Sequence, residues 1–172
     1  MYTNLIQKHL SQGDIEGAMK QVATIGQKKD TSQLSSLIDL LKSTENKVLR
    51  NEIAIALSDI GDDRAVEPLI EVITDPKTSG SRGTLLSALE NLNYIVHIEN
   101  IIPFIGDSSL EVSAQSFMLL EQTMDSLSDS QNLSCQQRIE IQISNNQSKL
   151  LEVALDMLKK WRESAVGTIG TR

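Results

Sequence analysis

The feature that most constrains the fold is a pattern that recurs at a spacing of 32 residues. The segment "LRNEIAIALSDI" at 49–60 aligns with "SRGTLLSALENL" at 81–92, so that arginine falls on arginine and apolar residues fall on apolar residues. A second pattern, "QLSSLIDLL" at 33–41, aligns with "AVEPLIEVI" at 65–73 at the same spacing. Two different patterns that share one period predict a repeat architecture.

Each unit of the repeat is predicted to be a pair of amphipathic helices. The first helix carries apolar residues at i, i+3, i+4 and i+7, which are Val66, Leu69, Ile70 and Ile73. Pro76 ends this helix, because proline cannot continue a helix. Neither helix can bury its apolar face alone, so stacked pairs forming one continuous core, a solenoid, are expected.

Weaker copies extend the pattern in both directions. The segment "IIPFIGD" at 101–107 has Pro103 where the preceding copy has Pro68, and a helix follows with Ala114, Phe117, Leu119 and Leu120 on its apolar side. On the other side, "VATIG" at 22–26 resembles "LSDIG" at 57–61. This likeness predicts that Gly26 ends a helix, as Gly61 does, before a loop over 27–32.

The rest of the chain is also predicted to be helical. Helices are expected over Tyr2–Leu10, Ile15–Ile25, Gln136–Ser144 and Lys149–Ser164, with a polar loop at 125–134. The predicted fold is therefore all-α, an α-α superhelix of about three helical-pair repeats with helical caps. One domain is expected over 1–165, comprising an N-terminal cap (1–30), repeats (31–126) and C-terminal helices (131–165), followed by a loose tail (166–172).

The stretch "LRNEIAIALSDIGDDRAVEPLIEVITDP" resembles the HEAT repeat of the short bacterial, phycobilin-lyase type, an armadillo-like solenoid. The residues that carry the resemblance are Leu49, Arg50, Ile53, Ala54, Ala56, Leu57, Gly61, Asp62, Ala65, Val66, Leu69, Asp75 and Pro76. The likeness covers 34–92 and fades beyond Asn93. It implies that Arg50 and Arg82 join turn aspartates, Asp75 and Asp107, in a ladder between repeats. An anion site formed by the two arginines is the alternative.

Composition and charge exclude several classes of function. The formal net charge of −7 argues against binding to nucleic acid or to an anionic membrane, and favours a basic protein partner. Aromatic residues make up only 3% of the chain, so a helical core of aliphatic residues is expected. The single cysteine, Cys135, excludes an internal disulfide and a cysteine-rich zinc site. The segment "MYTNLIQKHLSQGD" lacks the pattern of a signal peptide, so a cytoplasmic location is expected.

Three aspartates near Gly61 raise the question of an acidic metal or catalytic loop. Asp59, Asp62 and Asp63 do not supply the regular ligand spacing of a calcium loop. We expect a turn in which Gly61 ends one helix and Asp62 or Asp63 caps the next. No catalytic residue, metal ligand or cofactor site is predicted, because His9 and His97 have no partner at ligand spacing. Trp161 is expected to pack and Cys135 to be unreactive.

The surface of the second helices remains as the candidate site, because in HEAT-like solenoids these helices line the concave face. The positions that the core does not use are Asn51, Glu52, Ile55, Asp59, Thr84, Ser87, Asn91, Gln115, Met118 and Gln122. Ile55 and Met118 are apolar there. They are either anchors for a partner or contacts with the terminal helices.

These observations predict a non-catalytic protein-binding module. An adaptor, an assembly factor or a small inhibitor would use the concave face in this way. Two alternatives stay open: an immunity protein that neutralises a toxin, and a subunit resembling bilin lyases that acts in chromophore attachment. A HEAT-like DNA glycosylase is disfavoured, because it would require a basic groove with aromatic residues.

Overall fold

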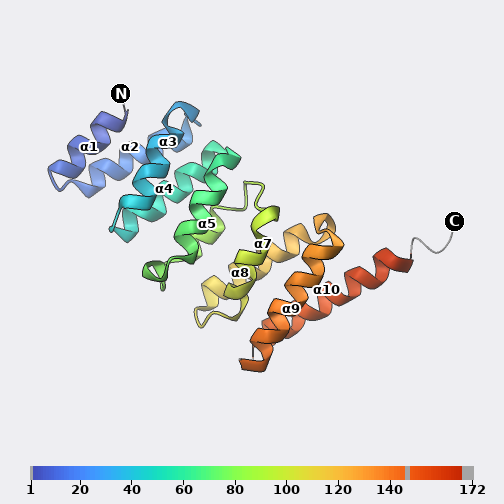
Figure 1. Ribbon diagram of the computed structural model, residues 1–172. Coiled ribbons are helices and arrows are strands. Elements are labelled where there is room, and N and C mark those ends of the chain that lie inside the picture. The colour runs from blue at the N-terminus through green and yellow to red at the C-terminus, as the bar shows by residue number, and fades with distance from the viewer. Residues whose placement is uncertain (1, 146–147, 168–172) are drawn as a thin grey trace. The chain divides into compact units, whose positions relative to one another are not determined.

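The computed structural model describes residues 2–145 and 148–167, and every regular element in that part of the chain is helical. The chain divides into two compact units, residues 1–94 and 95–172 (Figure 1). The range predicted for repeats, 31–126, crosses that boundary, so each unit is described by itself. None of the described helices has both the length and the apolar character needed to cross a bilayer.

The first unit contains six α-helices and three short 3₁₀ turns in its described residues. The helices are α1 (Tyr2–Ser11), α2 (Ile15–Gln27), α3 (Leu34–Ser43), α4 (Lys47–Ile60), α5 (Val66–Thr74) and α6 (Gly83–Ser87). The 3₁₀ turns are η1 (Thr31–Gln33), η2 (Asp63–Ala65) and η3 (Pro76–Thr78). Helices α2, α4 and α6 lie side by side in one layer, and α3 and α5 pack in the other (Figure 1).

The period of 32 residues extends to the N-terminus of the unit. Helix α1 has the bounds of α3 shifted by one period, and α2 begins one period before α4. The pair α1 and α2, predicted as a cap over 1–30, therefore has the geometry of a full repeat. Asp30 and Asp62 are also one period apart, and each accepts a hydrogen bond from a backbone N–H at the start of a 3₁₀ turn.

Gly26 does not end a helix, contrary to the sequence-based expectation. It lies inside α2 and is buried, and the left-handed backbone that corresponds to Gly61 (φ 71°) belongs to Lys29 (φ 51°). A Cβ added at Gly26 would lie 2.8 Å from the Cα of Ala56 on α4. The glycine is needed because it lets the backbones of α2 and α4 approach closely.

The second helix of the next copy is much shorter than predicted. The sequence predicted a second helix that starts after "KTSGS" at 77–81 and continues to Leu92, but α6 covers only Gly83–Ser87. Beyond it, Leu89 donates to Leu86 and Leu92 to Leu89 in tighter i→i−3 bonds. Leu85, Leu86, Leu89 and Leu92 are nevertheless buried, so the apolar pattern was correct even though the helix was not.

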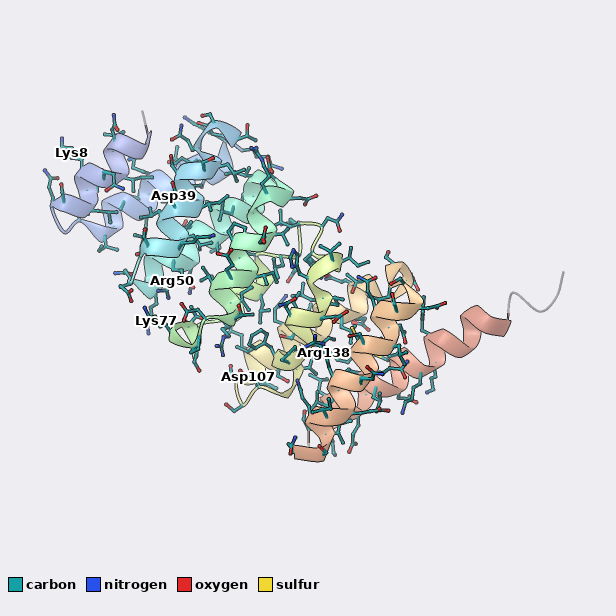
Figure 2. The ribbon with its side chains drawn as sticks, viewed as in Figure 1. Lys8, Asp39, Arg50, Lys77, Asp107 and Arg138 are labelled. Atoms are coloured by element: carbon teal, nitrogen blue, oxygen red, sulfur yellow. The ribbon has the colours of Figure 1, made fainter. Side chains whose placement is uncertain are left out.

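The repeat arginines bind backbone carbonyls within their own repeat. Arg50 is buried beside the end of α3 and donates from Nη2 to Thr44 O at 2.8 Å (Figure 2). Arg82 donates from Nε to Ile73 O at 2.7 Å and from Nη2 to Asp75 O at 3.2 Å. The ladder expected for Arg50 is therefore wrong, because this guanidinium caps free carbonyls at the end of the preceding helix instead.

The second unit comprises η4 (Ile95–His97), α7 (Ile98–Ile101), η5 (Ile102–Gly106), α8 (Leu110–Thr123), η6 (Met124–Ser126), α9 (Asp129–Asn145) and α10 (Lys149–Gly167). Pro103 lies in η5. On α8, Val112, Ser113, Ser116, Leu119 and Leu120 are buried, whereas Ala114 and Phe117 are half-buried. The predicted apolar side of α8 is therefore confirmed at Leu119 and Leu120, whereas Ala114 and Phe117 are only partly buried.

The polar loop predicted over 125–134 is largely helix α9. Gln131 N donates to Ser128 Oγ and Ser128 N donates to Gln131 Oε1, the reciprocal pair of a capping box. Asn132 is buried and donates to Leu158 O at 3.2 Å, which ties α9 to α10. Helix α10 runs to Gly167, so the predicted tail over 166–172 begins in helix, and 168–172 lie outside the described residues.

Candidate functional site

The outward surface of α2, α4 and α6 is made of positions that repeat every 32 residues. We call it the second-helix surface of the first unit. Its members are Lys20, Ala23 and Gln27 on α2, Glu52, Ile55 and Asp59 on α4, and Thr84, Ser87 and Asn91 on and after α6. The residues of α4 and α6 are among the predicted candidates. Those of α2 were missed because α2 was interpreted as a cap, although extending the period backward would have found them.

Helix α4 presents a mixed acidic and apolar stripe on this surface. Val48 and Ile55 are 49% and 44% exposed, and Glu52 and Asp59 lie on the same side of the helix. The four residues follow the i, i+4, i+7, i+11 spacing of one helix face. Val48 was not among the predicted residues. Ile55 is solvent-exposed within the first unit.

Other candidate residues of the unit are less accessible. Asn51 is half-buried, and its Oδ1 is buried without a hydrogen-bond partner within the described residues. Thr84 is half-buried, and exposed Ser87 donates to Glu90 Oε1 at 3.2 Å. Ser87 therefore has a partner within its own helical turn.

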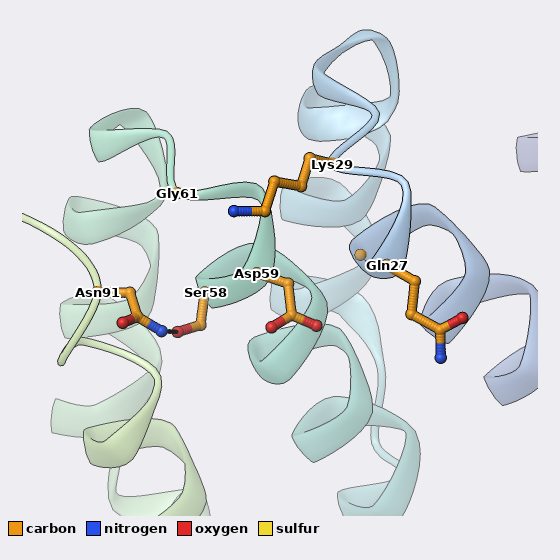
Figure 3. A pocket seen from close by; sticks show the side chains of 7 residues that line it. Gln27, Lys29, Ser58, Asp59, Gly61 and Asn91 are labelled. Carbon is orange, nitrogen blue, oxygen red and sulfur yellow. Dashed lines mark hydrogen bonds between the residues drawn. The ribbon is translucent and has the colours of Figure 1, made fainter.

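A cavity of about 470 Å³ opens at one end of the second-helix surface (Figure 3). It lies where α2 and α4 end, and its lining residues come from equivalent positions in three repeats. They are Gly26 and Ser58, then Gln27, Asp59 and Asn91, and finally Lys29 and Gly61. We call it the helix-end pocket. Among the predicted residues, the structure brings Asp59 and Asn91 together here.

The walls of the helix-end pocket are fixed by backbone packing. A Cβ at Gly26 would lie 3.2 Å from Asp59 Oδ2, so the absence of a side chain leaves room for this carboxylate. Asn91 Nδ2 donates to Ser58 Oγ at 3.1 Å, which joins the second and third copies of the repeat (Figure 3). The Lys29 side chain extends from the loop after α2 toward the end of α4 (Figure 3).

The other two aspartates near Gly61 have structural roles. Asp62 caps η2 and pairs with Arg64 at 2.6 Å, and hydrogen bonds from the Arg64 side chain and backbone lower the pKa of Asp62 to about 2. Asp63 Oδ1 accepts from Asn93 N at 2.8 Å and so connects one repeat to the next. Asp59, by contrast, makes no hydrogen bond or ion pair within the described residues.

The remaining predicted residues lie on α8 in the second unit. Gln115, Met118 and Gln122 share one side of this helix, and Met118 is 43% exposed. Their i, i+3, i+7 spacing matches a single exposed stripe. They form a separate candidate surface belonging to the second unit.

The cysteine and His9 of the described part of the chain are buried and paired, respectively. Cys135 is buried, and burial together with Glu99 raises the pKa of its thiol to about 11. His9 pairs with Asp14 at 2.7 Å, beside the start of α2. No group of three potential metal ligands was found among the described residues. Trp161 is half-buried on α10.

Comparison with known proteins agrees with the helical repeat geometry. The family model of HEAT repeats matches residues 3–90, a range that includes α1 and α2. The chain belongs to the HEAT-repeat family. HEAT repeats are generally protein-interaction modules and are typically non-catalytic. No curated protein and no solved structure matches the chain.

Proposed function

We propose that this HEAT-repeat chain is a non-catalytic protein-binding module that holds a basic, partly apolar segment of its partner on the second-helix surface. The observation that carries the proposal is the stripe on α4, in which exposed Val48 and Ile55 alternate with Glu52 and Asp59. An apolar side chain of the partner covers Val48 and Ile55. A cationic side chain of the partner pairs with Glu52 or Asp59.

The energetics favour such a partner. Burying an exposed isoleucine or valine side chain contributes about 1–3 kcal/mol, which is the size of an interface hot spot. The first unit has thirteen acidic and ten basic residues, so its net charge attracts a basic surface. Thr84, Ser87 and Asn91 on the neighbouring copy carry no charge that would oppose this attraction.

Site-specific crosslinking tests the proposal. A photoreactive residue at position 55 is compared with one at position 39, which is exposed on α3 in the other helix layer (Figure 2). We expect a discrete protein adduct in extracts of the source cell from position 55 only. The adduct formed from position 55 should disappear when Val48→Asp is introduced on the same stripe, and should persist with Asp39→Asn. Equal labelling from both positions, or no adduct, would contradict the proposal.

The adduct also identifies the role. An adaptor or assembly factor is expected to capture a component of a larger complex, and a small inhibitor or immunity protein is expected to capture an enzyme or toxin whose activity falls on binding. A role in chromophore attachment predicts an absorbance change when the chain is mixed with a free bilin. We expect no such change, because the residues that line the helix-end pocket include no aromatic side chain that could stack on a bilin.

A further inference from the structure

The geometry points to the helix-end pocket as the anchor site for a single arginine side chain of the partner. This inference rests on the proposed function, since it names the group that enters one end of the second-helix surface. Three features of the pocket carry it: its position at helix ends, the carboxylate oxygens of Asp59 and the open space beside Gly61.

The pocket lies at the negative ends of helices. The last carbonyls of a helix have no partner within it, and the helix dipole makes that end favourable for a cation. Helices α2 and α4 both end here. The carboxylate of Asp59 adds a full negative charge between the two ends, and it is exposed and unpaired within the described residues.

The acceptors of the pocket suit a guanidinium better than an ammonium. Asp59 offers two carboxylate oxygens, whereas the amide of Gln27, at the equivalent repeat position, points away from Asp59 (Figure 3). Asn91 uses its Nδ2 to donate to Ser58, which leaves its Oδ1 as an acceptor. A guanidinium has five N–H donors in one plane and can serve several acceptors at once, whereas an ammonium is a compact point charge.

Gly61 provides space for a flat group. A Cβ at Gly61 would meet only Ser58 O, at 4.0 Å, so there is open space beside Gly61, whereas the space beside Gly26 is already filled by Ala56 and Asp59. A planar guanidinium can therefore lie against the backbone beside Gly61. Any larger residue at Gly26 would push α4 away.

The positive charge of Lys29 disfavours binding of an arginine in the pocket, so a substitution of Lys29 tests the proposed site. At its position the next repeat has Gly61, and glycine is the residue that the left-handed backbone favours. The Lys29 ammonium extends toward the end of α4 (Figure 3), so an incoming cation must displace it. Removing this charge should strengthen binding of an arginine and weaken binding of a carboxylate.

NMR titration of the isotope-labelled chain with a blocked arginine, Nα-acetyl-arginine amide, tests the assignment. We expect concentration-dependent shifts of the Gly26, Gly61 and Asn91 signals, and weak binding, because an exposed ion pair with an isolated side chain contributes little free energy. The uncharged isostere Nα-acetyl-citrulline amide should give none, and the blocked lysine should bind more weakly. Asp59→Asn should abolish the shifts, Asp39→Asn should leave them unchanged, and Lys29→Ala should lower the Kd about threefold.

Two results would overturn the assignment. One is equal binding of the arginine and citrulline probes, and the other is arginine binding that survives Asp59→Asn. The position-55 adduct separates this inference from the proposed function. If Asp59→Asn leaves the position-55 adduct intact while Val48→Asp removes it, the binding module stands and the arginine anchor falls. If the arginine probe binds through Asp59 but no adduct forms, the anchor stands as a cation site and the proposed function falls.

Discussion

Helices α4 and α6 begin as copies of one sequence pattern and end as different structures. Helix α4 spans Lys47–Ile60, whereas α6 spans only Gly83–Ser87. The difference starts one residue before the helix. Asn46 accepts hydrogen bonds from Val48 N and Leu49 N and so starts α4. Its counterpart, Thr78, turns its hydroxyl back to Val72 O and Asp75 O.

The comparison teaches that a repeat conserves its buried apolar positions more strictly than its helices. Without a forward cap, the chain after Thr78 makes a turn through Gly80 (φ 82°), and the helix begins four positions late. Leu57 and Leu89 are still both completely buried. Leu57 is thus buried by an α-helix, α4, whereas Leu89 is buried by the short helix α6 and the 3₁₀-type turns that follow it.

The largest expected effect compares these two leucines. Leu57→Ala should lower the free energy of unfolding by about 4 kcal/mol and Leu89→Ala by about 3 kcal/mol, because both leave cavities but α4 is packed between α2 and α6. Urea denaturation followed by circular dichroism measures both. A larger loss at Leu89 would mean that the short copy is the better packed one.

The next effect concerns two glycines with different reasons for being glycine. Gly26→Ala should cost about 2 kcal/mol, because its Cβ would lie 2.8 Å from the Cα of Ala56. Gly80→Ala should cost about 1 kcal/mol, because it meets nothing within 4 Å but has a left-handed backbone. If both changes cost the same in thermal unfolding, close helix approach at Gly26 would not be the constraint we infer.

A third pair tests the start of each helix. Asn46→Ala and Thr78→Val should each cost about 1 kcal/mol, the first by loss of a cap and the second by loss of the hydroxyl's bonds. The two variants should destabilise different parts of the chain. Amide hydrogen exchange should rise at the start of α4 in Asn46→Ala, and in the turn over 76–81 in Thr78→Val. Faster exchange at α4 in both variants would contradict separate helix starts.

The smallest effect is a pH dependence at the turn between the copies. Hydrogen bonds from Arg64 lower the folded-state pKa of Asp62 to about 2, below its ordinary value of 3.8. The contribution of Asp62 to stability is therefore present above the ordinary pKa and is lost as the pH falls toward 2. Carboxyl NMR titration should show this low pKa, and Arg64→Gln should raise it. A titration near 3.8 in the unchanged chain would refute the pairing.

Much of the fold and part of the candidate site could be predicted from local pattern. The left-handed cap at Gly61 and the capping role of Asp62 follow from residue chemistry within a few positions, and both are confirmed. The start of α9 was missed although its signal, the Ser128 and Gln131 capping box, is local. Asp59 and Asn91 could be placed on an exposed face by the repeat period.

The period, the helical pairs and the buried apolar stripe were determined by the sequence alone, because they depend on spacing along the chain. The tertiary structure decided the features that depend on neighbours distant in sequence. Gly26 is required by the position of Ala56, and Arg50 finds a carbonyl at the end of α3. The helix-end pocket exists because three repeats bring equivalent residues together, and only packing fixes how closely their helices approach.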